Sequence, residues 1–197
     1  MTRNERTGWL GLAASLGFLA ALLAFAAFDP AYSHATKAVS ELGAVGAPNR
    51  LAWNLIGFLG VGGLLSVFGW GLGKAVDDRP TAWLLLLFGI AFAATAVPAD
   101  MSDLGSAGSV AHIVASQAVF LFWVLALGRL LFVRTGVAGL RLATAAALVL
   151  AVASIVLRGS ELLLPGLSQR VSFAVMFGWV AAVSALLLRS SRRDPLR

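Results

Sequence analysis

Residues 9–28 read WLGLAASLGFLAALLAFAAF, twenty consecutive positions without a charged side chain. An α-helix needs about 20 apolar residues to cross a hydrocarbon core about 30 Å thick. Five further apolar stretches follow this one. The sequence therefore predicts six membrane spans, over residues 9–28, 51–72, 81–97, 109–132, 140–157 and 171–188.

The composition also indicates a membrane protein. Hydrophobic residues make up 59% of the chain and charged residues 12%, with a mean hydropathy of +0.89, which is more apolar surface than a soluble domain of this length buries. The runs are continuously apolar rather than alternating, and helices satisfy their own backbone hydrogen bonds in lipid, so helices are favoured over a β-barrel. We predict an all-α, polytopic six-helix bundle, with residues 1–197 forming one domain.

Lysine and arginine are distributed unequally between the two sides of this predicted bundle. Eleven lie on the side of both chain termini, and four lie on the opposite side: Lys37, Arg50, Arg158 and Arg170. The positive-inside rule therefore predicts that both termini are cytoplasmic. The net charge of +6 fits a basic face against anionic lipid headgroups. Nucleic-acid binding is not predicted, because no soluble surface is available to carry a basic patch.

The first span has an alternative interpretation as a signal peptide. Arg3 and Arg6 precede it, and the small residues Ala24 and Ala26 imitate a cleavage site. Its apolar run is longer than the roughly 7–15 residues usual for such a peptide, which favours a retained span.

The longest connection, residues 29–50, is predicted to contain a short amphipathic helix at the outer interface. Ser33 suits the N-cap of that helix and Gly43 suits its C-terminal stop. Its apolar face would consist of Ala35, Val39 and Leu42. Such a helix would cover the bundle as a lid. The alternative is a connector that rests its apolar face on lipid.

His112 is the sharpest candidate for function. Ser109, His112 and Ser116 fall at i, i+3 and i+7 of the fourth span, so they share one stripe of that helix. An ionisable residue about one turn inside a span is a functional candidate by default. The alternative is a structural histidine bonded to a neighbouring helix. Asp100 and Asp103 precede the stripe in a loop without a basic residue.

The polar residues near the outer ends of the spans are predicted to converge in one outer-facing pocket. We expect that pocket to contain Glu41, Asn54, Asp100, Asp103, His112 and Arg158. Further binding candidates are Arg50, Ser109, Ser116 and Glu161. The catalytic candidates are His112, Asp100 and Asp103. No metal site and no cofactor are predicted, because the chain has two histidines and His34 lies in a loop.

The second span is rich in glycine and contains one GxxxG pair, Gly69 and Gly73. Small residues at this spacing let two helix backbones approach closely. The pair is therefore predicted to mediate tight packing or a homo-oligomer.

The run SELGAVGAPN at residues 40–49, followed by the glycine-rich span, resembles a prokaryotic family of six-helix membrane proteins catalogued as domain of unknown function 998. The pattern at the junction of the third and fourth spans is similar to the same family, through Pro98, Asp100, Gly105, Gly108 and His112. The resemblance implies a six-helix fold over nearly the whole chain and a place in the prokaryotic inner membrane. It implies no catalytic residue.

Three classes of function stay open at this point. The leading one is binding, or transport, of a lipid headgroup or small polar molecule in the outer pocket, with membrane lipids as the expected partners. The second is an intramembrane hydrolase or transferase that uses His112 with Asp100 or Asp103 as general acid and base. The third is a structural or partner-binding protein in which the polar cluster only orients helices.

Overall fold

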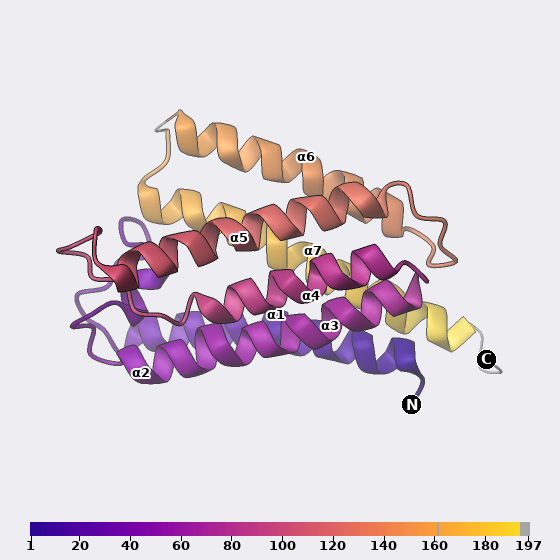
Figure 1. Cartoon of the computed structure of the whole chain (residues 1–197), viewed down its shortest axis with the longest axis horizontal. Helices are drawn as coiled ribbons and strands as arrows, with labels where there is room; N and C mark the ends of the chain where they lie inside the picture. The colour runs from indigo at the N-terminus through magenta and orange to yellow at the C-terminus, as the bar shows by residue number, and fades with distance from the viewer. Residues whose placement is uncertain (161, 194–197) are drawn as a thin grey trace.

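Six apolar helical segments run back and forth along the molecule in the computed structural model, which describes residues 1–160 and 162–193 (Figure 1). The segments are α1 (Arg3–Ala27), the continuous run of α2 (Arg50–Trp53), η2 (Asn54–Gly60) and α3 (Val61–Ala75), then α4 (Arg79–Ala94), α5 (Ala107–Leu130), α6 (Leu140–Gly159) and α7 (Pro165–Arg193). Five are long and apolar enough to cross a membrane, and α4 is a shorter apolar helix. The predicted all-helical, multi-pass membrane bundle is confirmed.

The chain connections gather at two opposite ends of the bundle. One end, which we call the terminal end, carries both termini and the α3–α4 and α5–α6 connections (Figure 1). The other end carries the α1–α2, α4–α5 and α6–α7 connections. We call it the long-loop end, because residues 28–49 form the longest of these connections.

Side-chain caps set several of the helix boundaries. Thr2 and Glu5 form a capping box at the start of α1, and the Ser106 hydroxyl accepts the Ser109 amide at the start of α5. The helix predicted over residues 81–97 ends earlier, at Ala94. There the Thr95 hydroxyl donates to the Phe92 carbonyl at 2.6 Å, and Pro98 disfavours helical backbone at the residue before it.

Glycines bring α3 and α4 into close contact. Gly69 and Gly73 are both buried, and a Cβ at Gly69 would lie 2.6 Å from the Cβ and carbonyl oxygen of Leu85. A Cβ at Gly73 would collide with the backbone of Ala82. The GxxxG pair therefore lies against α4 of the same chain, which is the tight packing that its spacing predicts.

The predicted helix in the long connection is shorter than expected and lies elsewhere. It is a single 3₁₀ segment, η1 (Val39–Gly43), rather than an α-helix starting at Ser33. Val39 and Leu42 are buried in the core of the bundle rather than resting on lipid. The Glu41 carboxylate accepts the Ala38 amide at 2.7 Å, so it caps its own helix.

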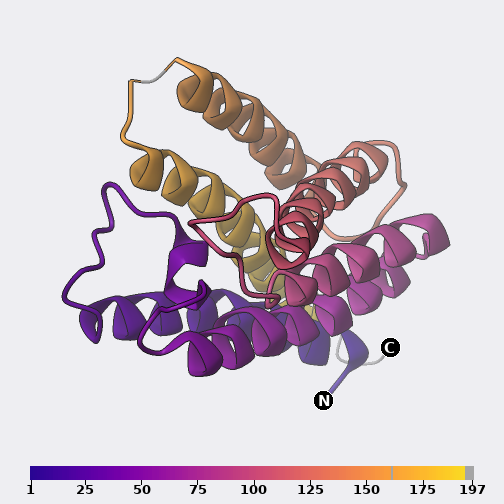
Figure 2. The ribbon, with the colours of Figure 1, turned by 60° about the vertical axis from the view of Figure 1, so that its left-hand side comes forward.

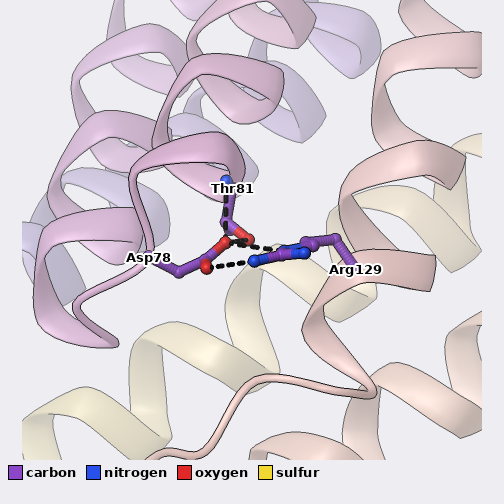
Figure 3. A network of polar contacts seen from close by, with 3 residues as sticks. All are labelled: Asp78, Thr81 and Arg129. Atoms are coloured by element: carbon purple, nitrogen blue, oxygen red, sulfur yellow. Dashed lines mark hydrogen bonds and ion pairs between the residues drawn. The ribbon is translucent and has the colours of Figure 1, made fainter.

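An ion pair joins two helices at the terminal end (Figure 3). Asp78 is the N-cap of α4, where its carboxylate accepts both the amide and the hydroxyl of Thr81. Arg129 of α5 donates to the same carboxylate through Nε at 3.1 Å and Nη2 at 2.8 Å. Hydrogen bonding from Arg129, followed by that from Thr81, holds the pKa of Asp78 well below its usual range, against the opposing effect of partial burial.

The close α3–α4 contact predicts that Gly69→Ala lowers thermal stability. The new methyl group meets Leu85 backbone, so overpacking should cost about 1–3 kcal/mol. Gly63→Ala is the matched control, because Gly63 lies on the same helix with nothing within 4 Å of its Cβ position. Thermal unfolding in detergent should show a lower Tm for Gly69→Ala and an unchanged or raised Tm for Gly63→Ala. Equal Tm values would contradict this packing.

Two variants should separate the role of Asp78 as the N-cap of α4 from its role in the ion pair with Arg129. Asn also caps helices, so Asp78→Asn should lose only the pair with Arg129, whereas Asp78→Ala should lose about 1 kcal/mol more. Because the pKa of Asp78 is lowered on folding, its stabilisation is present above the ordinary Asp pKa of about 4 and is lost as pH falls below it. Tm measured against pH should therefore fall less steeply in acid for Asp78→Asn than for the parent. Asp77→Asn, at the exposed neighbouring position, should leave that slope unchanged.

Candidate functional site

A cavity of about 560 Å³ lies between α5, α6 and α7. Its walls are completed by Phe92 of α4, Phe58 of η2, and Ala38 and Ser40 of the long connection. The volume falls within the range of roughly 300–1,000 Å³ that is usual for small-molecule pockets. The cavity is therefore large enough to hold a ligand.

The cavity opens sideways between α5 and α6. These two helices lie closer at the terminal end and diverge toward the long-loop end in both ribbon views (Figures 1 and 2). Each of these two helices contributes an exposed isoleucine to the lining, Ile113 of α5 at 43% and Ile155 of α6 at 51%. In a membrane, that side of the bundle faces lipid.

Polarity changes along the length of the cavity. Ser40, Arg158 and Gln169 lie at the long-loop end, whereas Trp123 and Met176 lie deeper. Along α5 the lining runs from His112 to Trp123, eleven residues or about 16 Å. The cavity thus has a polar mouth at the long-loop end and an apolar floor toward the middle of the bundle.

His112 is held in one orientation at this mouth. Its Nδ1 lies 3.0 Å from the carbonyl oxygen of Val97, and the ring contacts the edge of Phe58. A carbonyl oxygen only accepts, so Nδ1 carries the hydrogen. Nε2 has no hydrogen-bond partner among the residues that the structure describes. Nε2 is therefore the ring nitrogen left for a ligand, on a buried side chain that lines the cavity.

Asp100 and Asp103 organise their own loop and do not line the cavity. The Asp100 carboxylate accepts the amide and hydroxyl of Ser102, at 2.9 and 2.6 Å, and the hydroxyl contact lowers the pKa of Asp100. Asp103 accepts the amide of Gly105 at 3.0 Å. Neither of these two described carboxylates makes a hydrogen bond with His112. They serve as turn-forming residues.

Ser109 ties this loop to α5 instead of facing the cavity. Its hydroxyl oxygen accepts the Asp100 amide at 2.8 Å and lies 3.1 and 2.9 Å from the carbonyl oxygens of Asp100 and Asp103. The side chain is fully buried. Ser109 therefore has a structural role at the start of α5.

The remaining predicted site residues divide between the cavity and other positions. Ser116 and Arg158 line the cavity together with His112. Asn54 donates to the Gly43 carbonyl at 3.0 Å and so bridges η2 and η1, and Glu41 caps η1. Arg50 is exposed on α2, and Glu161 lies outside the described residues. The structure brings three of the predicted residues to one cavity and places the other described ones outside its lining.

The cavity is also lined by polar residues that were not predicted from the sequence. They are Ser40, Thr95, Gln117, Ser154, Gln169 and Ser172. On α7 the lining residues Gln169, Ser172, Phe173 and Met176 follow the i, i+3, i+4, i+7 spacing of one helix face. Gln169 and Ser172 could have been predicted from the sequence, because polar side chains within a span face the bundle interior.

Residues 32–43, which we call the strap, dock on the first turns of α7. The Arg170 guanidinium donates to three strap residues: to the Lys37 carbonyl at 2.9 Å, to the Tyr32 hydroxyl, and to His34 Nδ1 at 3.2 Å. It also donates to the Gly166 carbonyl of its own helix at 2.7 Å. Because a guanidinium only donates, His34 Nδ1 is unprotonated. Burial and the nearby charge of Arg170 lower the pKa of His34, which favours this neutral form.

Two further contacts place the strap at the cavity mouth. The Val39 amide donates to Gln169 Oε1 at 2.6 Å, and the Leu167 amide donates to the Ala35 carbonyl at 3.1 Å. Gly166 allows this approach, because a Cβ there would lie 2.7 Å from Ala35 backbone. Ala38 and Ser40 consequently form part of the cavity lining.

These contacts predict that Arg170→Ala releases the strap. With three hydrogen bonds to the strap removed, trypsin should cleave after Lys37 about tenfold faster in the detergent-solubilised protein. Arg158→Ala is the matched control, because it also removes an arginine near the mouth but makes no hydrogen bond to the strap in the described structure. Mass spectrometry of the fragments identifies the cut. Equal rates in the two variants would show that Arg170 does not hold the strap.

Comparison with known proteins adds a family but no characterised relative. The family model described as protein of unknown function (DUF998) matches residues 12–186, a range that includes all of α5 and α6 and most of α7. No curated protein and no solved structure matches the chain. The chain belongs to the DUF998 family of proteins of unknown function.

Proposed function

We propose that this membrane protein binds an amphiphilic molecule of the bilayer in the cavity between α5, α6 and α7. The observation that carries the proposal is the combination of a sideways opening at Ile113 and Ile155 with a polar mouth and an apolar floor. A molecule with a polar head and an apolar chain matches this gradient. It can enter from lipid without crossing the bundle core.

The chemistry of the mouth supports binding over acid–base catalysis. His112 is oriented by Val97 and leaves Nε2 for a ligand, which suits a hydroxyl because a hydroxyl can donate or accept. General acid–base chemistry with Asp100 or Asp103 would need a carboxylate near the imidazole, and both carboxylates are engaged in their own turns. No contact in the described structure therefore specifically supports a hydrolase or a transferase.

We further propose that the long-loop end faces away from the cytoplasm. The support is the charge distribution, with eleven lysine and arginine residues on the side of the termini and four on the other. In that orientation the polar mouth lies at the level of the outer headgroups of the inner membrane. The ligand would then be drawn from the outer leaflet.

Photolabelling tests whether the cavity binds an amphiphile. The purified protein is irradiated with photoactivatable, single-chain probes that carry either a carboxylate or an alcohol head, and the labelled peptides are mapped. We expect either probe to label α5, α6 and α7 at cavity-lining positions. Ile155→Trp should reduce this labelling about fivefold or more, because the larger ring narrows the opening.

Val152→Trp is the matched control for this experiment. Val152 lies on the same helix, is 60% exposed and does not line the cavity, so its replacement should leave cavity labelling unchanged. Labelling spread evenly over all lipid-facing helices, and insensitive to both substitutions, would overturn the proposal.

A further inference from the structure

We infer that the ligand of this cavity carries an anionic headgroup, a carboxylate or a phosphate, bound at the mouth by Arg158 and Gln169. The inference rests on the proposed function, because it concerns the head of the amphiphile that the cavity would hold. It goes further by assigning that head a charge and two contact residues.

The described cavity lining carries positive charge and no negative charge. Arg158 is the one charged residue among the described lining residues, and no aspartate or glutamate occurs among them. The ion pair of Arg129 with Asp78, at the opposite end of the bundle, is the one salt bridge in the described part of the chain. No carboxylate among the described lining residues compensates Arg158, so a cationic head would meet like charge there, whereas an anionic head would pair with it.

Gln169, the second residue assigned to the head, also presents donors. Val39 presents an amide, which only donates, so the Gln169 atom bonded to it is the side-chain oxygen. The Gln169 NH₂ group is therefore left with two donors. The Arg158 guanidinium adds five donors in a planar fork, which fits the two oxygens of a carboxylate or phosphate.

Two of the hydroxyl groups lining the cavity are already committed as donors. Thr95 donates to the Phe92 carbonyl at 2.6 Å, and Ser154 donates to the Ala151 carbonyl at 2.8 Å. Arg158 and Gln169 supply the nitrogen donors proposed to bind the head, and they come from two different helices. An anionic group between them would join α6 to α7 where α6 diverges from α5 (Figure 2).

A competing explanation is that Arg158 is an ordinary interfacial arginine. Long basic side chains near span ends commonly extend toward headgroups without forming a site. Arg50 offers a direct comparison, because it is an exposed arginine at the same end of the bundle but does not line the cavity. Removing each arginine separately distinguishes a specific contact from a general surface charge.

The test compares photoactivatable probes with the same chain and different heads: a carboxylate, a phosphate monoester and an uncharged alcohol. Half-saturating concentrations for labelling the cavity peptides are measured in the parent protein, Arg158→Gln, Arg158→Lys and Arg50→Gln. In the parent, we expect at least one anionic probe to saturate at about tenfold lower concentration than the alcohol. The anion that saturates first identifies the source as a free acid or a phosphate lipid.

The variants decide whether Arg158 is responsible. Arg158→Gln should abolish the preference for anions while keeping labelling by the alcohol, which also shows that the variant is folded. Arg158→Lys should keep part of the preference, and Arg50→Gln should keep all of it. Equal labelling by charged and uncharged probes in the parent, or a preference that survives in Arg158→Gln, would overturn the inference and leave the proposed function standing. Failure of every probe to label the cavity would overturn the proposed function itself.

Discussion

The rest of this structure depends on the need to satisfy polar groups where water is absent. In hydrocarbon an unpaired backbone amide or carbonyl costs several kcal/mol, so each span must be helical. The same constraint acts on side chains within the spans. Ser15, Ser66 and Ser184 each donate to the carbonyl four residues earlier, at 3.0, 2.8 and 2.7 Å. The hydroxyl groups of these three serines are therefore satisfied by their own helices.

Against this background, polar groups without a protein partner become informative. The Nε2 atom of His112 and the NH₂ group of Gln169 make no hydrogen bond to the described residues, although the opposite atom of each side chain is bonded to backbone and both side chains line one cavity. Such an arrangement fixes the side chain and leaves a directed group for something else. Fixed polar groups facing a space that opens to lipid are typical of a recognition site rather than of a packed core.

The sequence was sufficient to predict the membrane spans and some of the residues that line the cavity. The spans follow from composition alone, and His112, Ser116 and Arg158 could be found because span position and helical spacing are local properties. Asp100 and Asp103 were misleading, because short-range hydrogen bonds to Ser102 and Gly105 use their carboxylates inside the loop. Gln169 was missed, since its role depends on the Val39 amide 130 residues away. Convergence of this kind is set by tertiary packing and has no local signature.

Because α6 diverges from α5, a change in the tilt of α6 would move its cavity-lining residues by unequal amounts. α6 is 20 residues long, so Arg158 lies about 27 Å from the start of the helix at Leu140. A tilt of about 5° around that start would move the Arg158 backbone by about 2 Å, but would move Ala151 only about three-fifths as far. Small changes in the angle of one helix therefore alter the contacts with the head of a bound molecule more than the space around its chain.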